Sequence, residues 1–205
     1  MRPQITIAGE APLPRYNVVA MPILPREVNI FPEDLLEASY VAADEARWLV
    51  VHTKPRQEKS LARDAVARSV PCYLPLVPKQ SRPRGRTITS FSPLFAGYMF
   101  ACVDAEQRLT LLQTNRVSRT VDVEDQELLT TQLRDLEKLI AVDAPLTIER
   151  KLQPGRAVRV KSGPFEGIEG TIVARKGRDR LVVAVTLLQQ GVSVEIGDFQ
   201  VEPIY

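Results

Sequence analysis

The hydrophobic pattern of this 205-residue chain changes once, near Asp143, and this change limits what the chain can fold into. Before Asp143, short apolar runs typical of strands alternate with amphipathic segments typical of helices. After it, only short alternating segments remain, and glycines stand between them. The pattern therefore predicts two folded units joined by a linker.

Residues 46–142 are expected to form an α+β unit, an antiparallel sheet flanked by helices. The clearest helix is expected over 126–140, where one stripe carries Leu129, Leu133, Leu136 and Ile140. Two further helices are expected over 57–69 and 105–114. Strands are expected over 48–52, 72–77, 98–103 and 117–123, and a hairpin is expected around the turn 82–86.

The chain after this unit is expected to be all β. Residues 143–153 contain Pro145 and break the periodicity, so they are assigned to the linker. Residues 154–205 contain alternating segments such as 181–188, separated by turn residues. They predict a small five-stranded β-barrel, an architecture that often serves in recognition.

The first 45 residues carry six of the sixteen prolines and no sustained period, so an extended, flexible leader is expected. Within it, residues 32–36 have acidic side chains suited to a first helical turn. A flexible tail is the favoured interpretation of this segment, and a short helix or a docking peptide is the alternative.

Positive charge is concentrated in one part of the chain. Residues 47–86 hold ten Lys and Arg side chains against only Glu58 and Asp64. This asymmetry points to a polyanionic partner, such as nucleic acid, or to a solvated helix face beside a charged hairpin.

The composition argues against several other classes of protein. Two cysteines and one histidine are too few for a disulfide scaffold or a four-ligand zinc site. Acidic clusters near 104–106 and 122–125 sit at expected helix starts, where acidic residues are common. No apolar run reaches the roughly 18 residues that a membrane span needs. We therefore expect a cytoplasmic, non-enzymatic protein with no catalytic residues, cofactor, metal or membrane contact.

Two stretches of sequence resemble a known family. The segment VRVKSGPFEGIEG at 158–170, followed by VSVEI at 192–196, resembles a KOW-type SH3-like barrel. Upstream, WLVVHTKPRQE at 48–58 and PLFAGYMF at 93–100 resemble the N-terminal (NGN) domain of NusG-type transcription factors. CYLP at 72–75 and RGR at 84–86 resemble the specialised RfaH-like branch. The resemblance covers about 48–205.

The resemblance implies a monomeric elongation or antitermination factor that suppresses pausing or termination on a subset of operons. The NGN domain would grip the clamp helices of the largest RNA polymerase subunit and lie beside upstream or non-template DNA. The KOW barrel would recruit a partner, either ribosomal protein S10 or, less favoured, Rho. Leu109–Leu112 and Gln189–Gln190 depart from the family pattern, the latter at a loop implicated in Rho contact.

The resemblance also implies three groups of site residues. The polymerase-binding patch would contain aromatic and apolar side chains on one sheet face: His52, Phe95, Tyr98, Phe100 and Val117. Nucleic acid would be contacted by basic side chains: Lys54, Arg56, Arg82, Arg84, Arg86 and Arg116. The KOW partner would contact apolar side chains at turns: Phe165, Ile168, Leu187 and Leu188.

One other function stays open on the sequence alone. A KOW barrel also suits a ribosome-associated RNA-binding protein, because ribosomal proteins carry the same motif. That hypothesis predicts ribosome binding that survives deletion of residues 46–142, whereas the transcription hypothesis places the main contact inside those residues.

Overall fold

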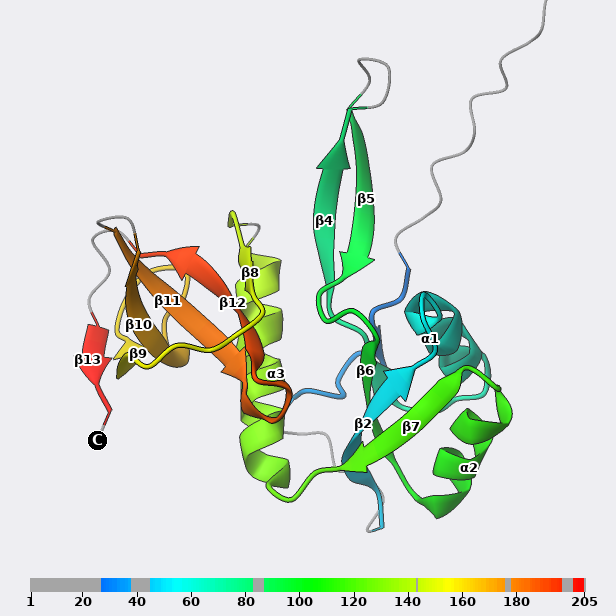
Figure 1. The fold of residues 1–205 in the computed structure, drawn as a ribbon. Helices are drawn as coiled ribbons and strands as arrows, with labels where there is room; N and C mark the ends of the chain where they lie inside the picture. Colours follow the sequence, from blue (N-terminus) through cyan, green and yellow to red (C-terminus); the bar gives the residue numbers. More distant parts are fainter. Residues whose placement is uncertain are drawn as a thin grey trace, which may run out of the picture.

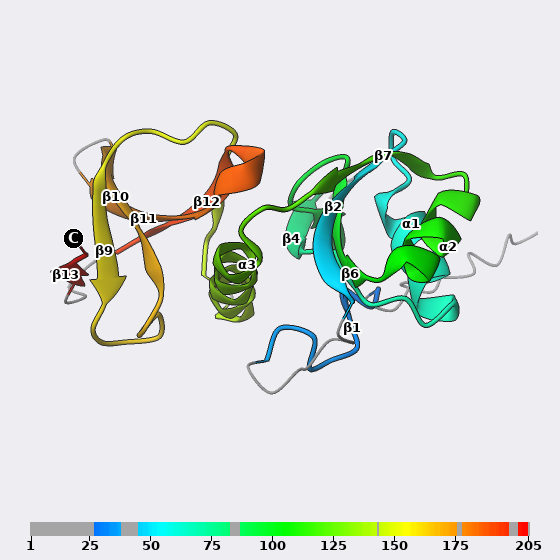
Figure 2. The same ribbon diagram turned by 90° about the horizontal axis from the view of Figure 1, so that it is seen from below.

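We analysed a computed structural model of the chain, which describes residues 27–37, 45–82, 87–142, 144–175, 178–196 and 201–204. An N-terminal sheet and a C-terminal sheet stand on either side of one long helix, α3 (Gln126–Ala141) (Figures 1 and 2). Both sheets are antiparallel. Within the described part of the chain, no helix is long and apolar enough to cross a membrane.

The N-terminal sheet has five strands in the order β1-β3-β6-β2-β7. These strands are β1 (Ile30–Phe31), β3 (Cys72–Tyr73), β6 (Tyr98–Val103), β2 (Arg47–Thr53) and β7 (Val117–Asp122). Alternation sends Leu49 and Met99 to one face of the sheet and Val50 and Phe100 to the other. The sheet is therefore buried on both faces.

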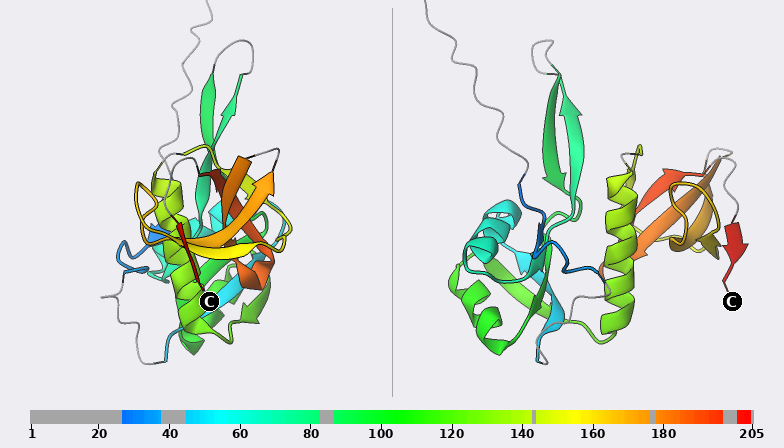
Figure 3. Two further views of the ribbon diagram at one scale, coloured as in Figure 1. Left: turned by 90° about the vertical axis from the view of Figure 1, so that its left-hand side faces the viewer. Right: turned by 180° about the vertical axis from the view of Figure 1, so that it is seen from behind.

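Helices α1 (Glu58–Ala67) and α2 (Ala105–Gln113) cover the face that carries Leu49 and Met99. Helix α3 covers the opposite face. Asp104 and Asp125 cap α2 and α3 by accepting hydrogen bonds from backbone N–H groups, which explains the acidic residues at these helix starts. The right-hand view in Figure 3 shows α3 between the two sheets.

A separate hairpin projects from the N-terminal sheet (Figure 1). It consists of β4 (Leu76–Ser81) and β5 (Ile88–Pro93), paired from Leu76↔Pro93 to Ser81↔Ile88. The strand expected over 72–77 is thus two strands, because Pro75 lies between β3 and β4 and cannot donate to a ladder.

The C-terminal sheet has six strands in the order β13-β9-β10-β11-β12-β8. The five expected strands are β9 (Arg156–Val160), β10 (Glu169–Arg175), β11 (Arg178–Val185), β12 (Gln190–Glu195) and β13 (Val201–Pro203); a short 3-10 turn, η2 (Thr186–Leu188), follows β11. The sixth, β8 (Thr147–Glu149), comes from the expected linker and pairs with β12. Closure of these strands into a barrel stays a prediction.

Part of the N-terminal leader is ordered against the N-terminal sheet. Strand β1 pairs with β3, and the following turn buries Leu35 and Leu36 in the core shared with α3. Nε of Arg134 donates a 2.8 Å hydrogen bond to the carbonyl oxygen of Leu36. The expectation of an extended, unstructured leader is therefore wrong for residues 27–37, and residues 1–26 and 38–44 lie outside the described residues.

Candidate functional site

The aromatic rings of the expected polymerase-binding patch lie deeper than the sequence predicts. Phe95 is 1% exposed and Phe100 is fully buried. The two rings meet edge to face with centroids 6.1 Å apart, and Tyr73 stacks on Phe100 at 6.3 Å. The expectation that these two rings form an exposed patch is corrected, because both rings are buried in the core that includes the leucines of α3.

The turn after the hairpin fixes the position of Phe95. Gly97 has a φ of +82°, a conformation that glycine adopts without strain. Its N–H donates a 2.7 Å hydrogen bond to Oε1 of Glu58 at the start of α1, and its carbonyl oxygen accepts from the N–H of Thr53. Helix α1 and strand β2 thus hold the turn that leads into β6.

His52 and Tyr98 are the members of the patch that keep some exposure on the α3 side. They sit opposite each other on β2 and β6, and their rings meet edge to face at 5.0 Å. Both side chains are half-buried. Val117 packs instead with the core beneath α1 and α2, so the structure does not bring it together with these rings.

A groove lined by both apolar and polar side chains lies at the base of the hairpin, and sequence reasoning missed it. The groove has a volume of about 750 Å³ and lies between the base of the β4–β5 hairpin, the end of α3 and strand β8. Its apolar lining includes Val77, Pro93, Ile140, Leu146 and Ile148. No periodic signal marks it, because its walls come from segments far apart in the sequence.

The basic side chains fall into two groups. At one end of the N-terminal sheet, the N–H of Lys54 donates to the carbonyl oxygen of Arg116 at 2.8 Å. Nε of Arg116 contacts Oδ2 of Asp64 at 2.7 Å, so an acidic neighbour already engages this guanidinium. Lys54 and Arg56 remain exposed. Arg82 is exposed on the hairpin, while Arg84 and Arg86 lie outside the described residues.

Two residues of the expected KOW partner patch are buried, and the other two keep some exposure. Phe165 is 3% exposed and Ile168 is fully buried, which corrects the expectation that they face a partner. The turn that carries Phe165 is closed by a hydrogen bond from the N–H of Ile168 to its carbonyl oxygen, and both side chains point into the core. Leu187 is 45% exposed, and Leu188 is half-buried.

Helix α3 also binds the C-terminal sheet through polar contacts. Gln132 and Thr186 exchange two hydrogen bonds, of 2.7 and 3.0 Å. The N–H of Glu169 donates to Oδ2 of Asp135 at 3.3 Å. Burial raises the pKa of the Asp135 carboxyl above its usual range, whereas the Glu169 N–H and Lys138 act in the opposite direction.

The remaining reactive groups of the described residues do not form a chemical centre. No cluster of three or more metal-ligating side chains occurs among them. Cys72 and Cys102 are free, and burial raises the pKa of their thiols to about 12 and about 11. They point to opposite faces of the sheet.

Comparison with known proteins finds a match for the first of the two expected units. Residues 46–140 match the family described as "Transcription termination factor nusG". A solved structure titled "Domain interaction in Thermotoga maritima NusG" is similar at 19% identity, with a TM-score of 0.39. That match covers 78% of this chain and 98% of the other. No curated protein matches the chain.

Proposed function

We propose that this protein is a non-enzymatic transcription elongation or antitermination factor that binds RNA polymerase. The match of residues 46–140 to the NusG family is the observation that carries the proposal. The groove at the base of the hairpin supports it, because a helical partner can insert apolar side chains that recur every three to four residues into such a groove.

The proposed contact is with the clamp helices of the largest polymerase subunit. Since Phe95 and Phe100 are buried, their role is to support the sheet from within, and the groove at the base of the hairpin supplies the contact surface. Tyr98 and His52 add a half-buried polar edge. Binding of this kind gains most of its free energy from a few well-packed apolar side chains.

Upstream or non-template DNA is the proposed second partner. The exposed side chains of Lys54 and Arg56 form the main contact with the DNA. Arg116 contributes less, because its guanidinium forms an ion pair with Asp64. Arg82 on the projecting hairpin adds positive charge at a second point. The proposal also includes RfaH-like action on a subset of operons, which the residues at 72–75 and 84–86 favour.

The C-terminal sheet is proposed to be a KOW-type barrel that recruits ribosomal protein S10 in preference to Rho. Leu187 is the apolar side chain of the expected patch that is most exposed to a partner.

Titration of core RNA polymerase with labelled protein tests the main proposal. Val77→Glu places a charge in the groove and should weaken binding about tenfold or more, which corresponds to about 1.4 kcal/mol. Ile88→Glu is the matched control, because Ile88 lies on the same hairpin, is 48% exposed and does not line the groove. Equal affinity of both variants for polymerase would contradict the proposed site.

A further inference from the structure

We infer that the outer edge of β12 is an acceptor site for an extended polypeptide segment, and that the chain's own strand β8 occupies it. The inference concerns a protein partner and does not depend on polymerase binding. Exposed sheet edges are common binding sites for added strands, since they offer unpaired backbone groups.

Strand β8 occupies the edge as a bound peptide would. Its three residues pair antiparallel with β12, in the register Thr147↔Ser193, Ile148↔Val192 and Glu149↔Gly191. It enters from the segment that joins α3 to the C-terminal sheet and contributes no further strand residues. A three-residue ladder is short for a strand, so the ladder alone holds β8 weakly.

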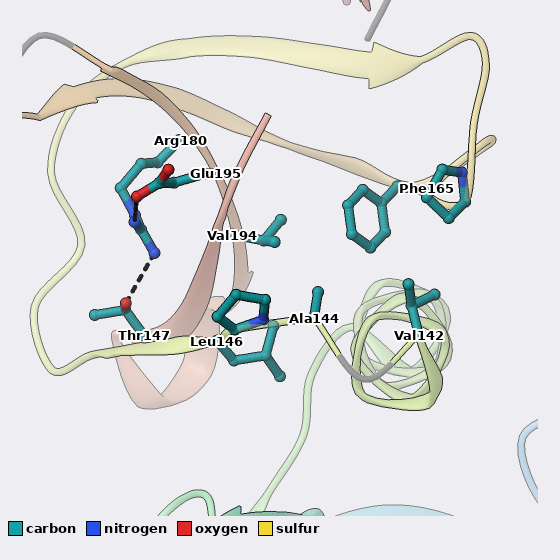
Figure 4. Close-up of a pocket in the computed structure, with 10 residues that line it drawn as sticks. Val142, Ala144, Leu146, Thr147, Phe165, Arg180, Val194 and Glu195 are labelled. Carbon is teal, nitrogen blue, oxygen red and sulfur yellow. Dashed lines mark hydrogen bonds and ion pairs between the residues drawn. The ribbon is translucent and has the colours of Figure 1, made fainter. Parts of the chain in front are cut away.

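Two side chains of β8 make specific polar contacts with the sheet. Oγ of Ser193, which is fully buried, donates a 2.7 Å hydrogen bond to Oε1 of Glu149, itself 5% exposed. Nη2 of Arg180 donates a 2.8 Å hydrogen bond to Oγ1 of Thr147 (Figure 4). The acceptor site therefore reads a hydroxyl and, two residues later, a carboxylate.

The middle residue of β8 contributes little apolar packing. The side chain of Ile148 is 44% exposed and faces the groove beside the hairpin. Removal of β8 from the edge thus forfeits the polar contacts of Thr147 and Glu149 and a short ladder but little buried apolar surface. This combination makes β8 replaceable by a segment with the same two polar groups.

The segment before β8 separates two hollows. On the side that faces the C-terminal sheet lies a pocket of about 450 Å³, lined by Phe165 and Val194 among others. Figure 4 shows their side chains around it. The 750 Å³ groove lies on its other side. Ala144, Pro145 and Leu146 line both. A partner segment can fill the same position with an apolar residue in place of Leu146.

The internal strand thus defines the partner that the site accepts. It is an extended protein segment with an apolar residue, then Ser or Thr, then any residue, then Asp or Glu. Because β8 is tethered, its effective concentration at the edge is on the order of millimolar. A partner segment must outcompete this tether, and its binding would free the chain between Ala141 and Arg156.

Fluorescence anisotropy with a labelled peptide of residues 145–150 tests the inference in the full-length chain. The double variant Thr147→Ala and Glu149→Ala weakens the internal strand, so it should bind the peptide at least about tenfold more tightly than the wild type. Ile148→Ala keeps both polar contacts and should bind as the wild type does. A peptide that carries Thr147→Val and Glu149→Gln should bind the double variant about tenfold more weakly than the original peptide.

Three results would overturn the inference: equal peptide binding by the wild type and the double variant, equal binding of both peptides, or no binding at all. Hydrogen exchange of the wild-type chain gives a test that does not depend on folding of a variant. The amides of Ile148 and Glu149 should exchange faster than those of Val182 and Val183 in β11. Equal protection of the two strands would show that β8 does not leave the edge.

Discussion

Oη of Tyr73 donates a 2.6 Å hydrogen bond to Oε2 of Glu137 and so joins strand β3 to helix α3. Tyr73 is fully buried, and its ring stacks on Phe100. This bond fixes the helix over the aromatic face of the N-terminal sheet. The covered state of Phe100 therefore depends on a polar contact as well as on leucine packing.

Substitution of Tyr73 tests this dependence. Tyr73→Phe removes the hydroxyl and leaves the ring, so it should lower the free energy of unfolding by about 2 kcal/mol, as expected for a hydrogen bond to a charged group. Tyr98→Phe makes the same chemical change at a half-buried ring and should stay within about 0.5 kcal/mol. Urea unfolding of the three proteins measures both, and similar losses would argue against a special role for Tyr73.

Asp135 should make stability depend on pH. Its pKa is raised above the ordinary value of 3.8 in the folded state, so the folded protein holds this proton to higher pH than the unfolded chain does. The protonated Asp135 carboxyl therefore favours the folded state at low pH. This contribution to the free energy of unfolding is lost as the pH rises through the raised pKa, because ionisation of a buried carboxyl is costly. Asp135→Asn cannot ionise. The variant's unfolding free energy, relative to wild type, should increase between about pH 3 and pH 7. A constant difference across this range would contradict the pKa direction.

The ordered part of the leader should contribute to stability. Leu36 is 6% exposed in the core, and Leu36→Ala should cost about 2 to 4 kcal/mol because it leaves a cavity. Val28 is 55% exposed, so Val28→Ala is the control and should change stability by less than about 0.5 kcal/mol. Thermal or urea unfolding distinguishes the two, and an unchanged Leu36→Ala variant would show that the leader is only loosely attached.

Asp64 should restrain the proposed DNA contact. Asp64→Ala removes the ion pair of Arg116 and leaves its guanidinium bonded only to the neutral Gln57, so affinity for forked DNA should rise and its salt dependence should steepen by about one phosphate contact. Lys54→Ala should weaken binding more than Arg116→Ala does, since Asp64 neutralises the charge of Arg116, whereas Nζ of Lys54 donates only to the neutral Oδ1 of Asn115. DNA titrations at several salt concentrations provide the measurement, and an unchanged slope for Asp64→Ala would contradict the restraint.

Leu187 and Phe165 should separate partner binding from folding. Phe165→Ala should lower the free energy of unfolding by about 4 kcal/mol because the ring is buried. Leu187→Ala should leave stability nearly unchanged and weaken binding of the recruited partner, here tested with purified ribosomal protein S10. If Leu187→Ala binds as wild type does, the partner surface lies elsewhere on the C-terminal sheet.

Local patterns predicted the elements whose burial follows from one period. The alternation in β6 placed Tyr98 and Phe100 on one face and Met99 on the other, and the leucine stripe predicted α3 to within a residue. The burial of Phe100 could not be predicted from the alternation. Whether a ring on a sheet face is exposed depends on which element packs above it, and α3 follows β6 by more than twenty residues.

The parts that sequence reasoning missed are short and held by distant partners. Strand β8 has three residues after a proline, too few for an alternating pattern, and its buried Glu149 is stabilised by Ser193 from β12. Strand β1 has two residues, and its neighbours Leu35 and Leu36 lie in a segment rich in proline and acidic residues. Long-range pairing, not local propensity, decides both.

The pairing of β1 with β3 also has a practical consequence for shortened versions of the protein. A fragment that begins at residue 46, where the family match starts, lacks the strand that covers β3 and the two leucines that sit against α3. Such a fragment exposes the unpaired edge of β3 next to apolar surface of the core, and it should therefore aggregate. Fragments for solution work should begin before Glu27.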